Sequence, residues 1–482
     1  MAEISIKKNR GVVYTPPFLV KLILDLSDYR GSNIRGKHII DNSCGDGAFL
    51  REIVDRYCSQ CLERSTPSNT IKRELETYIH AIEIDAEAVS RCRVHLDAVA
   101  QRYGIVGVEW DVKAGDATSA SEFDARMDFV VGNPPYVRIH NITRSSSLKK
   151  EFSLFQEGMS DLYIAFFEIG LRMLNAKGTL GYVTPSSYFN SVAGAKLREC
   201  FVKNRLLKKV VDFKHSQAFD DATTYSAITV LQKGRNEEDR TLFYEYDEVD
   251  RKPRRVCELQ ARDYYLAGKF FFARQAELNL LRDIFCGAGD SGVSVKNGFA
   301  TLCDSVFVSA SFPFRSKHII PVVKASKGLR QYIIFPYDEN SRPLSEEELK
   351  RDEELYRYLL SRREQLLSRS LEKSGREFWF LYGRSQGIAD VFKEKLTLNT
   401  LIRNISDLKI LNVPSGVGVY GGLYITSSSV PLSAVRVQLR SDEFVTYAAL
   451  LGKYKSGGYY AFSSKDVKKF LDYKLARERA TS

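Results

Sequence analysis

The sequence lacks the features that mark membrane-spanning or disulfide-stabilised proteins. No apolar run in its 482 residues approaches the roughly 18 residues that a membrane-spanning helix needs. The N-terminal segment has basic residues but no apolar stretch behind them, so it predicts no secretory signal. Eight cysteines are scattered along the chain, which indicates a reducing compartment rather than a disulfide framework.

Metal-binding and common nucleotide-binding patterns are also absent from the sequence. Cys58 and Cys61 form one CxxC, but no second pair and no histidine cluster stands at zinc spacing. Ordinary thiols in a helix and loop account for this pair better than a metal site does, so we expect no metal. The chain has neither a G-x-G-x-x-G nor a Walker motif, which disfavours dinucleotide and nucleoside-triphosphate binding.

The overall composition indicates a globular protein with a polyanionic partner. Hydrophobic residues make up 44% of the chain, and the net charge is +11. A nucleic acid is the first expectation for such a charge, with ribosomal neighbours and membrane surfaces as alternatives. The length exceeds that of one ordinary core, which predicts two domains.

From about residue 36 to residue 235, short apolar runs alternate with amphipathic stretches. This pattern predicts a largely parallel sheet covered by helices on both faces, an α/β domain of the doubly wound kind. We expect seven strands at 37–41, 78–84, 108–116, 127–132, 179–184, 207–213 and 226–233, and helices at 47–63, 86–103, 161–174 and 193–204.

The segment 233–255 is charged and poor in core residues, so we place a domain boundary there. The expected domains are residues 1–245 and 246–482. The second contains short strand-like runs and one long charged helix at 345–373, which predicts an α+β domain.

Polar residues end the first three predicted strands. In "DNSCGDGAFL" (41–50), Asp41 can accept hydrogen bonds, and Gly45 and Gly47 allow the backbone to approach a ligand. A plain strand-to-helix turn is the equal alternative for this loop taken alone.

The next two strand-end acids follow the same logic. Glu83 in "AIEID" can accept from two ribose hydroxyls, or it is a solvated acid. Asp116 in "KAGDAT" can accept from an exocyclic amine, or it caps a turn.

The fourth motif, "GNPPY" (132–136), ends a strand with two prolines that cannot continue a ladder. Asn133 offers an amide oxygen, Pro134 a carbonyl and Tyr136 a flat ring. Two acceptors beside a stacking surface suit a planar group that carries an NH2. A rigid loop whose tyrosine merely packs is the weaker alternative, since asparagine before two prolines has no evident folding advantage.

These motifs, in this order, resemble those of the S-adenosylmethionine-dependent amino-methyltransferases of DNA. The segment "VVYTPPFLVKLIL" (12–24) is similar to their cofactor-clamping motif. The clamp motif precedes the other motifs, and a long region follows them. This order resembles that of the gamma group of N6-adenine methyltransferases, the Eco57I/TaqI-like family of restriction-modification enzymes. The likeness covers residues 10–235 well and extends more loosely to "FPYDEN", "EFWFLYGRSQG" and "GGYYAFSSKDVKKFL" in the C-terminal half.

The resemblance implies a fold, a cofactor and a reaction. The fold is a Rossmann-like, seven-stranded methyltransferase domain at 1–245 followed by an α+β target-recognition domain at 246–482. The cofactor is S-adenosylmethionine, with no metal. The cofactor-binding residues that it implies are Thr15, Asp41, Asn42, Ser43, Gly45, Gly47, Glu83, Ile84, Asp116, Ala117 and Pro135.

The implied reaction is methyl transfer to N6 of an adenine flipped out of duplex DNA. Asn133 and the Pro134 carbonyl accept from the target amine, and Tyr136 stacks on the base. Phe219 covers the base from a later loop, with Tyr225 as second choice. Positioning and electrostatics carry the chemistry, so no group with a tuned pKa is required.

The implied partner is double-stranded DNA, gripped by the second domain. Arg138 either contacts a phosphate or is a solvated arginine. Trp379, Tyr382 and Arg384 are candidates for reading bases, although Trp379 is alternatively a core residue. We expect a cytoplasmic, nucleoid-associated monomer of a prokaryote that serves a restriction-modification system, with a cognate endonuclease acting separately.

Two rival functions remain from the sequence. The first is a methyltransferase for RNA or protein glutamine, because those enzymes share the NPPY motif. The region of about 230 residues behind the first domain argues for DNA instead. The second is a catalytically silent DNA specificity subunit, against which the intact set of Asp41, Glu83, Asp116 and Asn133 speaks.

Overall fold

The computed structural model describes residues 15–138, 145–155, 161–216, 219, 225–287, 289–369 and 378–481. The chain divides into two compact units, Met1–Asn279 and Leu280–Ser482. The first unit therefore extends beyond the boundary expected at residue 245. Among the described residues, no helix has both the length and the apolar character needed to cross a membrane.

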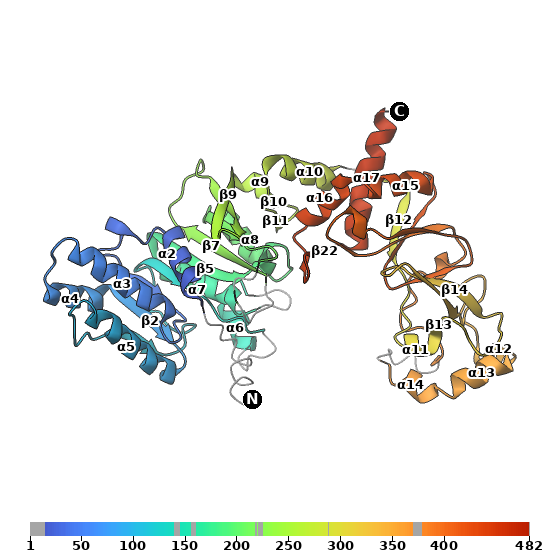
Figure 1. Cartoon of the computed structure of the whole chain (residues 1–482), viewed down its shortest axis with the longest axis horizontal. Helices are drawn as coiled ribbons and strands as arrows, with labels where there is room; N and C mark the ends of the chain where they lie inside the picture. Colours follow the sequence, from blue (N-terminus) through green and yellow to red (C-terminus); the bar gives the residue numbers. More distant parts are fainter. Residues whose placement is uncertain are drawn as a thin grey trace. The chain divides into compact units, whose positions relative to one another are not determined.

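The first unit is built on a nine-stranded sheet with the order β3-β2-β1-β4-β5-β7-β6-β8-β9 (Figure 1). All seven expected strands are present, but the expected count of seven is wrong. The strands are β1 Ile39–Asp41, β2 Ile79–Glu83, β3 Asp111–Ala114, β4 Met127–Gly132, β5 Leu174–Pro185, β6 Leu207–Asp212, β7 Ser226–Gln232, β8 Thr241–Asp247 and β9 Lys252–Leu259.

The two additional strands lie in the charged segment that was expected to link the domains. β8 pairs in parallel with β6, and β9 pairs antiparallel with β8. Thr241 and Phe243 point into the core, while their neighbours along β8 are only half-buried. Buried and half-buried positions thus alternate at the start of β8, which is the pattern of a strand with one less buried face, not of a linker.

The order of strands β3-β2-β1-β4-β5 is that of a doubly wound nucleotide-binding sheet, and these five strands are parallel. β7 is inserted antiparallel between β5 and β6. The strand order reverses between β1 and β4. In open α/β sheets, ligands bind at the carboxyl ends of the strands at such a point.

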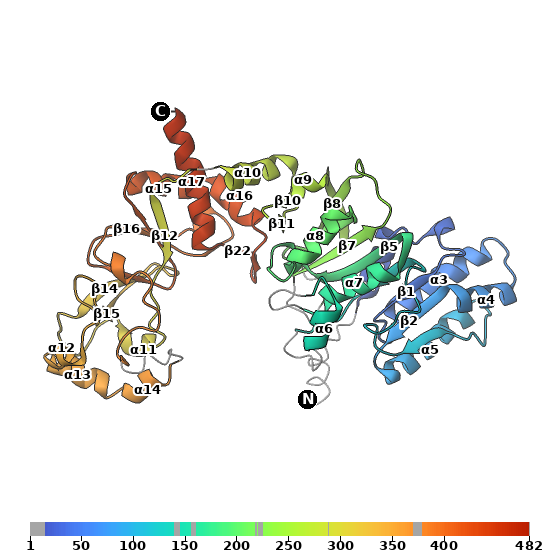
Figure 2. The same cartoon turned by 180° about the vertical axis from the view of Figure 1, so that it is seen from behind.

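Helices cover both faces of this sheet (Figures 1 and 2). On one face, four helices share one hydrophobic core: α2 Pro17–Leu26, α3 Ala48–Leu62, α4 Ser68–Tyr78 and α5 Ala86–Gln101. On the other face, α7 Tyr163–Met173 and α8 Ala195–Lys203 pack through Phe167 and Phe201. The remaining elements are α6 Ser145–Glu151, α9 Ala261–Tyr264, β10 Tyr265–Leu266, β11 Lys269–Phe270 and α10 Gln275–Cys286.

The second unit mixes short strands and helices. Its sheets have the orders β12-β20-β16-β18, β13-β15-β14-β19 and β17-β22-β21. The strands are β12 Val293–Asn297, β13 Val308–Ser309, β14 Ile319–Lys324, β15 Leu329–Ile334, β16 Lys395–Leu398, β17 Leu401–Ile402, β18 Ile410–Val413, β19 Gly418–Tyr420, β20 Leu423–Ser427, β21 Tyr454–Lys455 and β22 Tyr459–Ala461.

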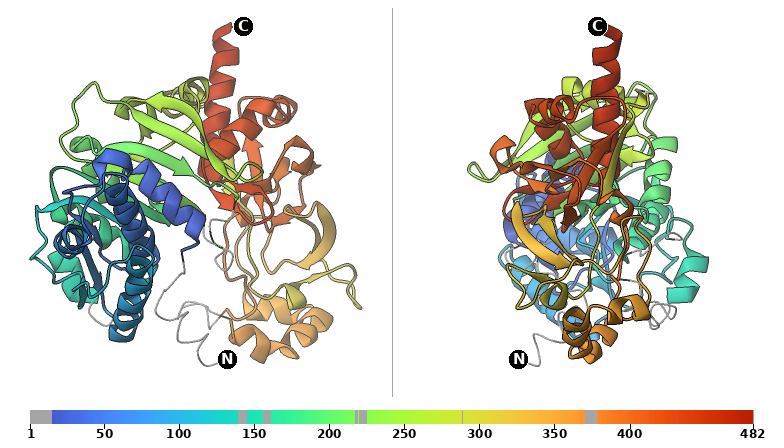
Figure 3. Two further views of the ribbon diagram at one scale, coloured as in Figure 1. Left: turned by 60° about the vertical axis from the view of Figure 1, so that its left-hand side comes forward. Right: turned by 90° about the vertical axis from the view of Figure 1, so that its right-hand side faces the viewer.

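The helices of the second unit include a long C-terminal helix, α17, which packs on β12 and α15 (Figure 3). They are α11 Asp304–Phe307, α12 Glu346–Lys350, α13 Glu353–Leu360, α14 Arg363–Leu367, α15 Leu432–Leu439, α16 Asp442–Leu450 and α17 Ser464–Thr481.

The single long helix expected at 345–373 is wrong over the described residues, because three short helices, α12 to α14, replace it. Ser345 caps the start of α12, and Asp352 accepts from the backbone N–H of Leu355 at 3.3 Å to start α13. An aspartate that caps a new helix ends the preceding one. The breaks allow apolar residues from all three helices to reach the core.

Candidate functional site

The expected site residues converge on one edge of the sheet, since the strands that carry them end side by side. Asp41 at the end of β1 is paired with Val131 of β4 and with Ala81 of β2. At the end of β2, the backbone carbonyl of Glu83 accepts from the N–H of Gly115 at 2.8 Å. The turn after β1, the acid of β2, the turn after β3 and the GNPPY loop after β4 therefore lie along one edge of the sheet.

Glu83 connects two of these turns. One carboxylate oxygen accepts from the N–H of Gly45 at 2.8 Å, and the other accepts from the N–H of Asp85 at 3.0 Å. Gly45 has a φ of +54°, and a Cβ there would meet no atom within 4 Å. Each carboxylate oxygen can accept a further hydrogen bond, so Glu83 can hold a diol beside an open backbone.

Gly47 allows α3 to start close against α5. Its φ is +93°, and a Cβ would lie 2.7 Å from the sulfur of Cys92 on α5. The glycine is therefore required both for its left-handed conformation and for the space it leaves.

Asp41 is buried beside the GNPPY loop, with 1% of its surface exposed. Its Oδ1 accepts from the N–H of Ser43 at 3.1 Å, and a Cβ on Gly132 would lie 2.9 Å from the same atom. Burial, with a smaller contribution from the nearby charge of Glu83, raises the pKa of Asp41 to about 8. The turn that was expected to contact the cofactor thus touches the loop that was expected to contact the target.

Asn42 is directed away from this edge, which changes the role expected for its side chain. Its Oδ1 accepts from the hydroxyl of Tyr182 at 2.9 Å, in a fully buried contact. Its Nδ2 faces the sulfur of Met173 at 4.0 Å. Ser43 next to it has a buried hydroxyl with no hydrogen-bond partner among the described residues. In this turn, the side chain available to a ligand belongs to Ser43.

Two apolar residues flank the strand-end acids. Ile84 is 74% exposed directly after Glu83, so its apolar side chain has surface on which a flat ligand can pack. Ala117, in contrast, is buried. Asp116 accepts from the N–H and the hydroxyl of Thr118 at 2.9 and 2.7 Å. It therefore has the turn-capping role considered from the sequence, and a carboxylate retains capacity for further donors.

The clamp segment and the GNPPY loop are in contact. The Asn133 amide donates to the hydroxyl of Thr15 at 3.1 Å, although the two residues are 118 positions apart. Thr15 is buried. Residues 12–14 of the clamp motif lie outside the described residues. The contact brings the expected cofactor clamp to the expected catalytic amide.

Tyr136 lies in an aromatic cluster. Its hydroxyl donates to the carbonyl of Val183 at 3.2 Å. Its ring meets those of Phe219 and Tyr163 edge to face, with centroids 6.3 and 6.4 Å apart. The ring of Tyr225, the second choice, instead meets His215. Pro134 and Pro135 are buried and half-buried.

The residues expected to contact DNA differ in their exposure to solvent. Arg138 is exposed and forms an isolated backbone bridge with Asp161. Trp379 and Tyr382 are 2% and 6% exposed in the core of the second unit, so they stabilise that core and do not present a surface to bases. Arg384 is exposed and remains available.

The sequence did not identify Tyr163 on α7 or Tyr182 on β5. Tyr163 contacts the ring of Tyr136, and Tyr182 donates a hydrogen bond to Asn42. Both lie in apolar runs, where a tyrosine resembles any other core residue. Only their partners, distant in the sequence, reveal their positions.

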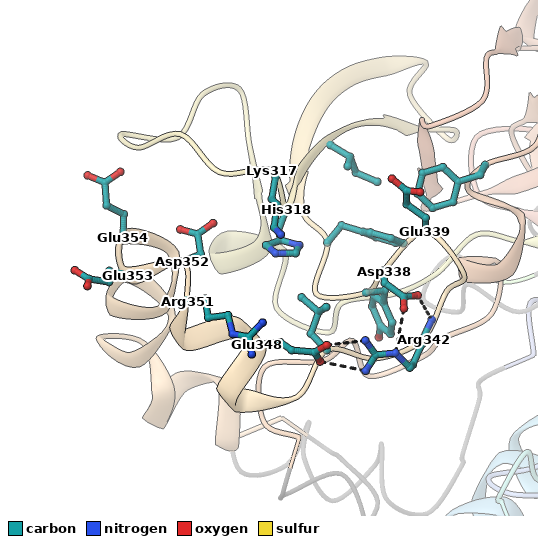
Figure 4. A pocket seen from close by; sticks show the side chains of 15 residues that line it. Lys317, His318, Asp338, Glu339, Arg342, Glu348, Arg351, Asp352, Glu353 and Glu354 are labelled. Atoms are coloured by element: carbon teal, nitrogen blue, oxygen red, sulfur yellow. Dashed lines mark hydrogen bonds and ion pairs between the residues drawn. The ribbon is translucent and has the colours of Figure 1, made fainter.

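The second unit contains a pocket of about 820 Å³ (Figure 4). Arg342 crosses it, in ion pairs with Asp338 and Glu348 at 3.0 and 2.7 Å. Its lining contains six acidic residues against three lysines and arginines. Across the described part of the chain, no group of three or more His, Cys, Asp or Glu is placed to hold a metal.

The fold of the chain is similar to that of solved restriction-modification enzymes. The chain matches the Type IIL restriction-modification enzyme MmeI, solved in complex with DNA, with a TM-score of 0.62 over 97% of this chain and 68% of that one. It matches the Type ISP enzyme LlaGI with a TM-score of 0.53 over 97% and 47%. Both are 13% identical to it, so they show the shared fold alone.

Residues 64–219 match the Eco57I restriction-modification methylase family. The chain therefore carries an Eco57I-type restriction-modification methylase domain, and the resemblance stated from its motifs is confirmed. The matched segment contains Glu83, Asp116 and the whole GNPPY loop.

Curated relatives agree with this family. The Type II methyltransferase M.BstVI of Geobacillus stearothermophilus is 32% identical over 54% of this chain and 48% of its own length. The Type II restriction enzyme and methyltransferase RM.Eco57I of Escherichia coli is 24% identical over 73% of this chain and 41% of its own. The chain thus spans less than half the length of these relatives.

Proposed function

We propose that this protein transfers a methyl group from S-adenosylmethionine to N6 of an adenine in duplex DNA, at a specific site. The contact between Thr15 and Asn133 carries the proposal. It brings the clamp motif to the amide that would receive the target amine, at the edge where Glu83 and Asp41 also lie. A cofactor and a target base held at this edge would meet.

The residues of the edge fit the cofactor. Glu83 would accept from the ribose hydroxyls while two backbone N–H groups hold its carboxylate. The exposed Ile84 would pack on the adenine ring, and Asp116 would accept from its amine. The buried hydroxyl of Ser43, which has no partner among the described residues, would bond the methionine part. When bound, S-adenosylmethionine supplies a methyl group on a positively charged sulfur.

The GNPPY loop suits an amine that is a poor nucleophile. The N6 lone pair of adenine is drawn into the ring, and acceptors on both amine hydrogens would favour a pyramidal nitrogen. Asn133 Oδ1 and the Pro134 carbonyl would be those acceptors. Their contribution is positioning and electrostatic stabilisation, which needs no general base in the loop. The proton can leave after the transfer.

The base would have to leave the duplex to reach Tyr136, at a cost of a few kcal/mol that stacking partly offsets. Phe219 now lies edge to face against the Tyr136 ring and is 2% exposed. We infer that Phe219, which contacts the Tyr136 ring in the free protein, would cover a base that stacks on Tyr136.

The second unit would bind the duplex and select the site. The pocket of Figure 4 is a poor candidate for the contact surface, because its acidic lining repels phosphates. Exposed basic residues such as Arg384 suit it better. We assign recognition to Leu280–Ser482 and place the enzyme, as a monomer, in a restriction-modification system with a separate endonuclease.

A transfer assay with tritiated S-adenosylmethionine would test the proposal. Duplex DNA, RNA and a release-factor protein are offered in parallel, and the labelled DNA is digested to nucleosides. We expect label in duplex DNA alone, as N6-methyladenine. Label only in RNA or protein, or as N4-methylcytosine, would contradict the proposal.

The variant Asn133→Ala is the matched control for this assay. It should bind S-adenosylmethionine in calorimetry but transfer no label. If the wild type binds no S-adenosylmethionine, the protein is instead a silent specificity subunit. Sequencing methylated DNA with modification-sensitive reads would then identify the recognised site.

A further inference from the structure

Tyr182 lies next to the catalytic loop on the neighbouring strand. It is on β5, paired in register with Gly132 of the GNPPY motif on β4. Its ring is fully buried on the face covered by α7, where it meets the ring of Phe167 at 5.4 Å. Tyr182 therefore lies directly beside the GNPPY motif, with its side chain on the face of the sheet that α7 covers.

The hydroxyl of Tyr182 reaches the turn after β1. Because β4 lies between β1 and β5, the side chain passes β4 to donate to Asn42 Oδ1 at 2.9 Å. Asn42 stands between Asp41 and Ser43, the residues of that turn that face the crevice. The side chain of Asn42 thus anchors the turn to β5.

Space for this hydroxyl is provided by a glycine on α7. A Cβ on Gly170 would lie 2.7 Å from the Tyr182 oxygen, closer than real Cβ atoms approach. The Phe166 carbonyl on the same helix stands 3.5 Å from that oxygen. Tyr182 of β5, Asn42 of the turn after β1 and Gly170 of α7 therefore meet around this one hydroxyl.

The next residue along β5 holds the other half of the site. The carbonyl of Val183 accepts from the Tyr136 hydroxyl at 3.2 Å. Two consecutive residues of one strand therefore hold the turn expected to bind the cofactor and the aromatic ring expected to bind the base. A shift of the turn relative to β5 is a shift relative to Tyr136.

We propose that Tyr182 is a positioning residue, which holds the cofactor-binding turn in register with the catalytic loop through Asn42. This inference rests on the proposed function, because it assumes that S-adenosylmethionine binds at the turn. It assigns to Asn42 a role as an anchor in place of a ligand contact.

The test variant is Tyr182→Phe, which removes the hydroxyl and leaves the ring. Asn42 then keeps a buried oxygen without its donor, and the turn can relax toward other partners. We expect the dissociation constant for S-adenosylmethionine, measured by calorimetry without DNA, to rise about fivefold to thirtyfold. The KM for the cofactor should rise in parallel, while the affinity for duplex DNA stays within twofold.

Tyr188→Phe is the matched control. Tyr188 is also fully buried in the first unit, and its hydroxyl pairs with that of Thr229 at 2.7 Å. Its removal costs a comparable buried hydrogen bond that does not touch the turn. We expect a similar loss of thermal stability from both variants but a change in cofactor affinity only from Tyr182→Phe.

A second variant, Gly170→Ala, places a Cβ 2.5 Å from Cδ1 of Leu180 and 2.7 Å from the Tyr182 oxygen, and it is the alternative test if Tyr182→Phe does not fold. It should also weaken cofactor binding. Unchanged cofactor affinity in the folded Tyr182→Phe variant, or equal losses in Tyr182→Phe and Tyr188→Phe, would overturn the inference while the proposed function stands. Absence of cofactor binding by the wild type would overturn both.

Discussion

Asp41 should make the protein less stable as the pH rises. Its carboxyl group is 1% exposed, and burial raises its pKa to about 8. The variant Asp41→Asn keeps nearly the same shape and an oxygen that can accept from the N–H of Ser43. It cannot ionise, so the comparison isolates the cost of the buried charge.

The sign and size of this pH dependence follow from the linkage between proton binding and folding. Unfolded aspartate ionises near pH 4, and folded Asp41 ionises near pH 8. Between these values the folded state binds one more proton than the unfolded state, so stability falls by about 1.4 kcal/mol per pH unit. The stability that the raised pKa of Asp41 contributes is thus fully present below about pH 4 and lost above about pH 8. The total loss of stability across this range is on the order of 5 kcal/mol.

Urea unfolding of the wild type and Asp41→Asn between pH 5 and pH 9, without cofactor, measures this difference. We expect the advantage of the variant to grow up to about pH 8 and then to level off. Glu237→Gln, which changes an acid that is 84% exposed, should follow the wild type. A difference between wild type and Asp41→Asn that does not depend on pH would refute the reasoning.

Three further substitutions test other parts of the site. Asn133→Ala should lower methyl transfer by at least about 100-fold, with cofactor affinity within about threefold in calorimetry. Tyr136→Ala should weaken binding of duplex DNA by about 1–3 kcal/mol, measured by competition with a duplex that lacks the target base. Gly47→Ala places a Cβ 2.7 Å from the Cys92 sulfur and should cost about 1–3 kcal/mol of stability in urea unfolding, more than Gly36→Ala, where nothing lies within 4 Å.

The strands that carry the site were predictable because they are short apolar runs that end in polar turns. Strands buried on both faces have this pattern, and their ends share one edge of a parallel sheet. β8 escaped prediction because its sequence contains a threonine and two acids, and five of its seven residues are only half-buried. The long helix at 345–373 failed because Asp352 fits a helix as an ordinary surface acid, and only its capping contact shows that a helix starts there.

Within the site, sequence predicts residues that act through local position and misses those that act through distant partners. Glu83 and Asn133 were placed correctly at one edge of the sheet because each stands at the end of a strand, and their roles stay predictions. Asn42 was assigned to the cofactor for the same reason, but its partner Tyr182 lies 140 positions away. Nothing local distinguishes an asparagine that faces the crevice from one that faces the core, so this assignment required the fold.

The turn after β1 and the GNPPY loop are in direct contact in this fold, which bears on how the proposed cofactor and target base would be bound. Gly132 opens the GNPPY loop against the carboxylate of Asp41, and Asn133 joins that loop to Thr15. No side chain could be added at Gly132 without moving Asp41. An adjustment of the turn would therefore move the GNPPY loop as well, so the proposed cofactor should change the affinity of the enzyme for DNA, and DNA should change its affinity for the cofactor by the same factor.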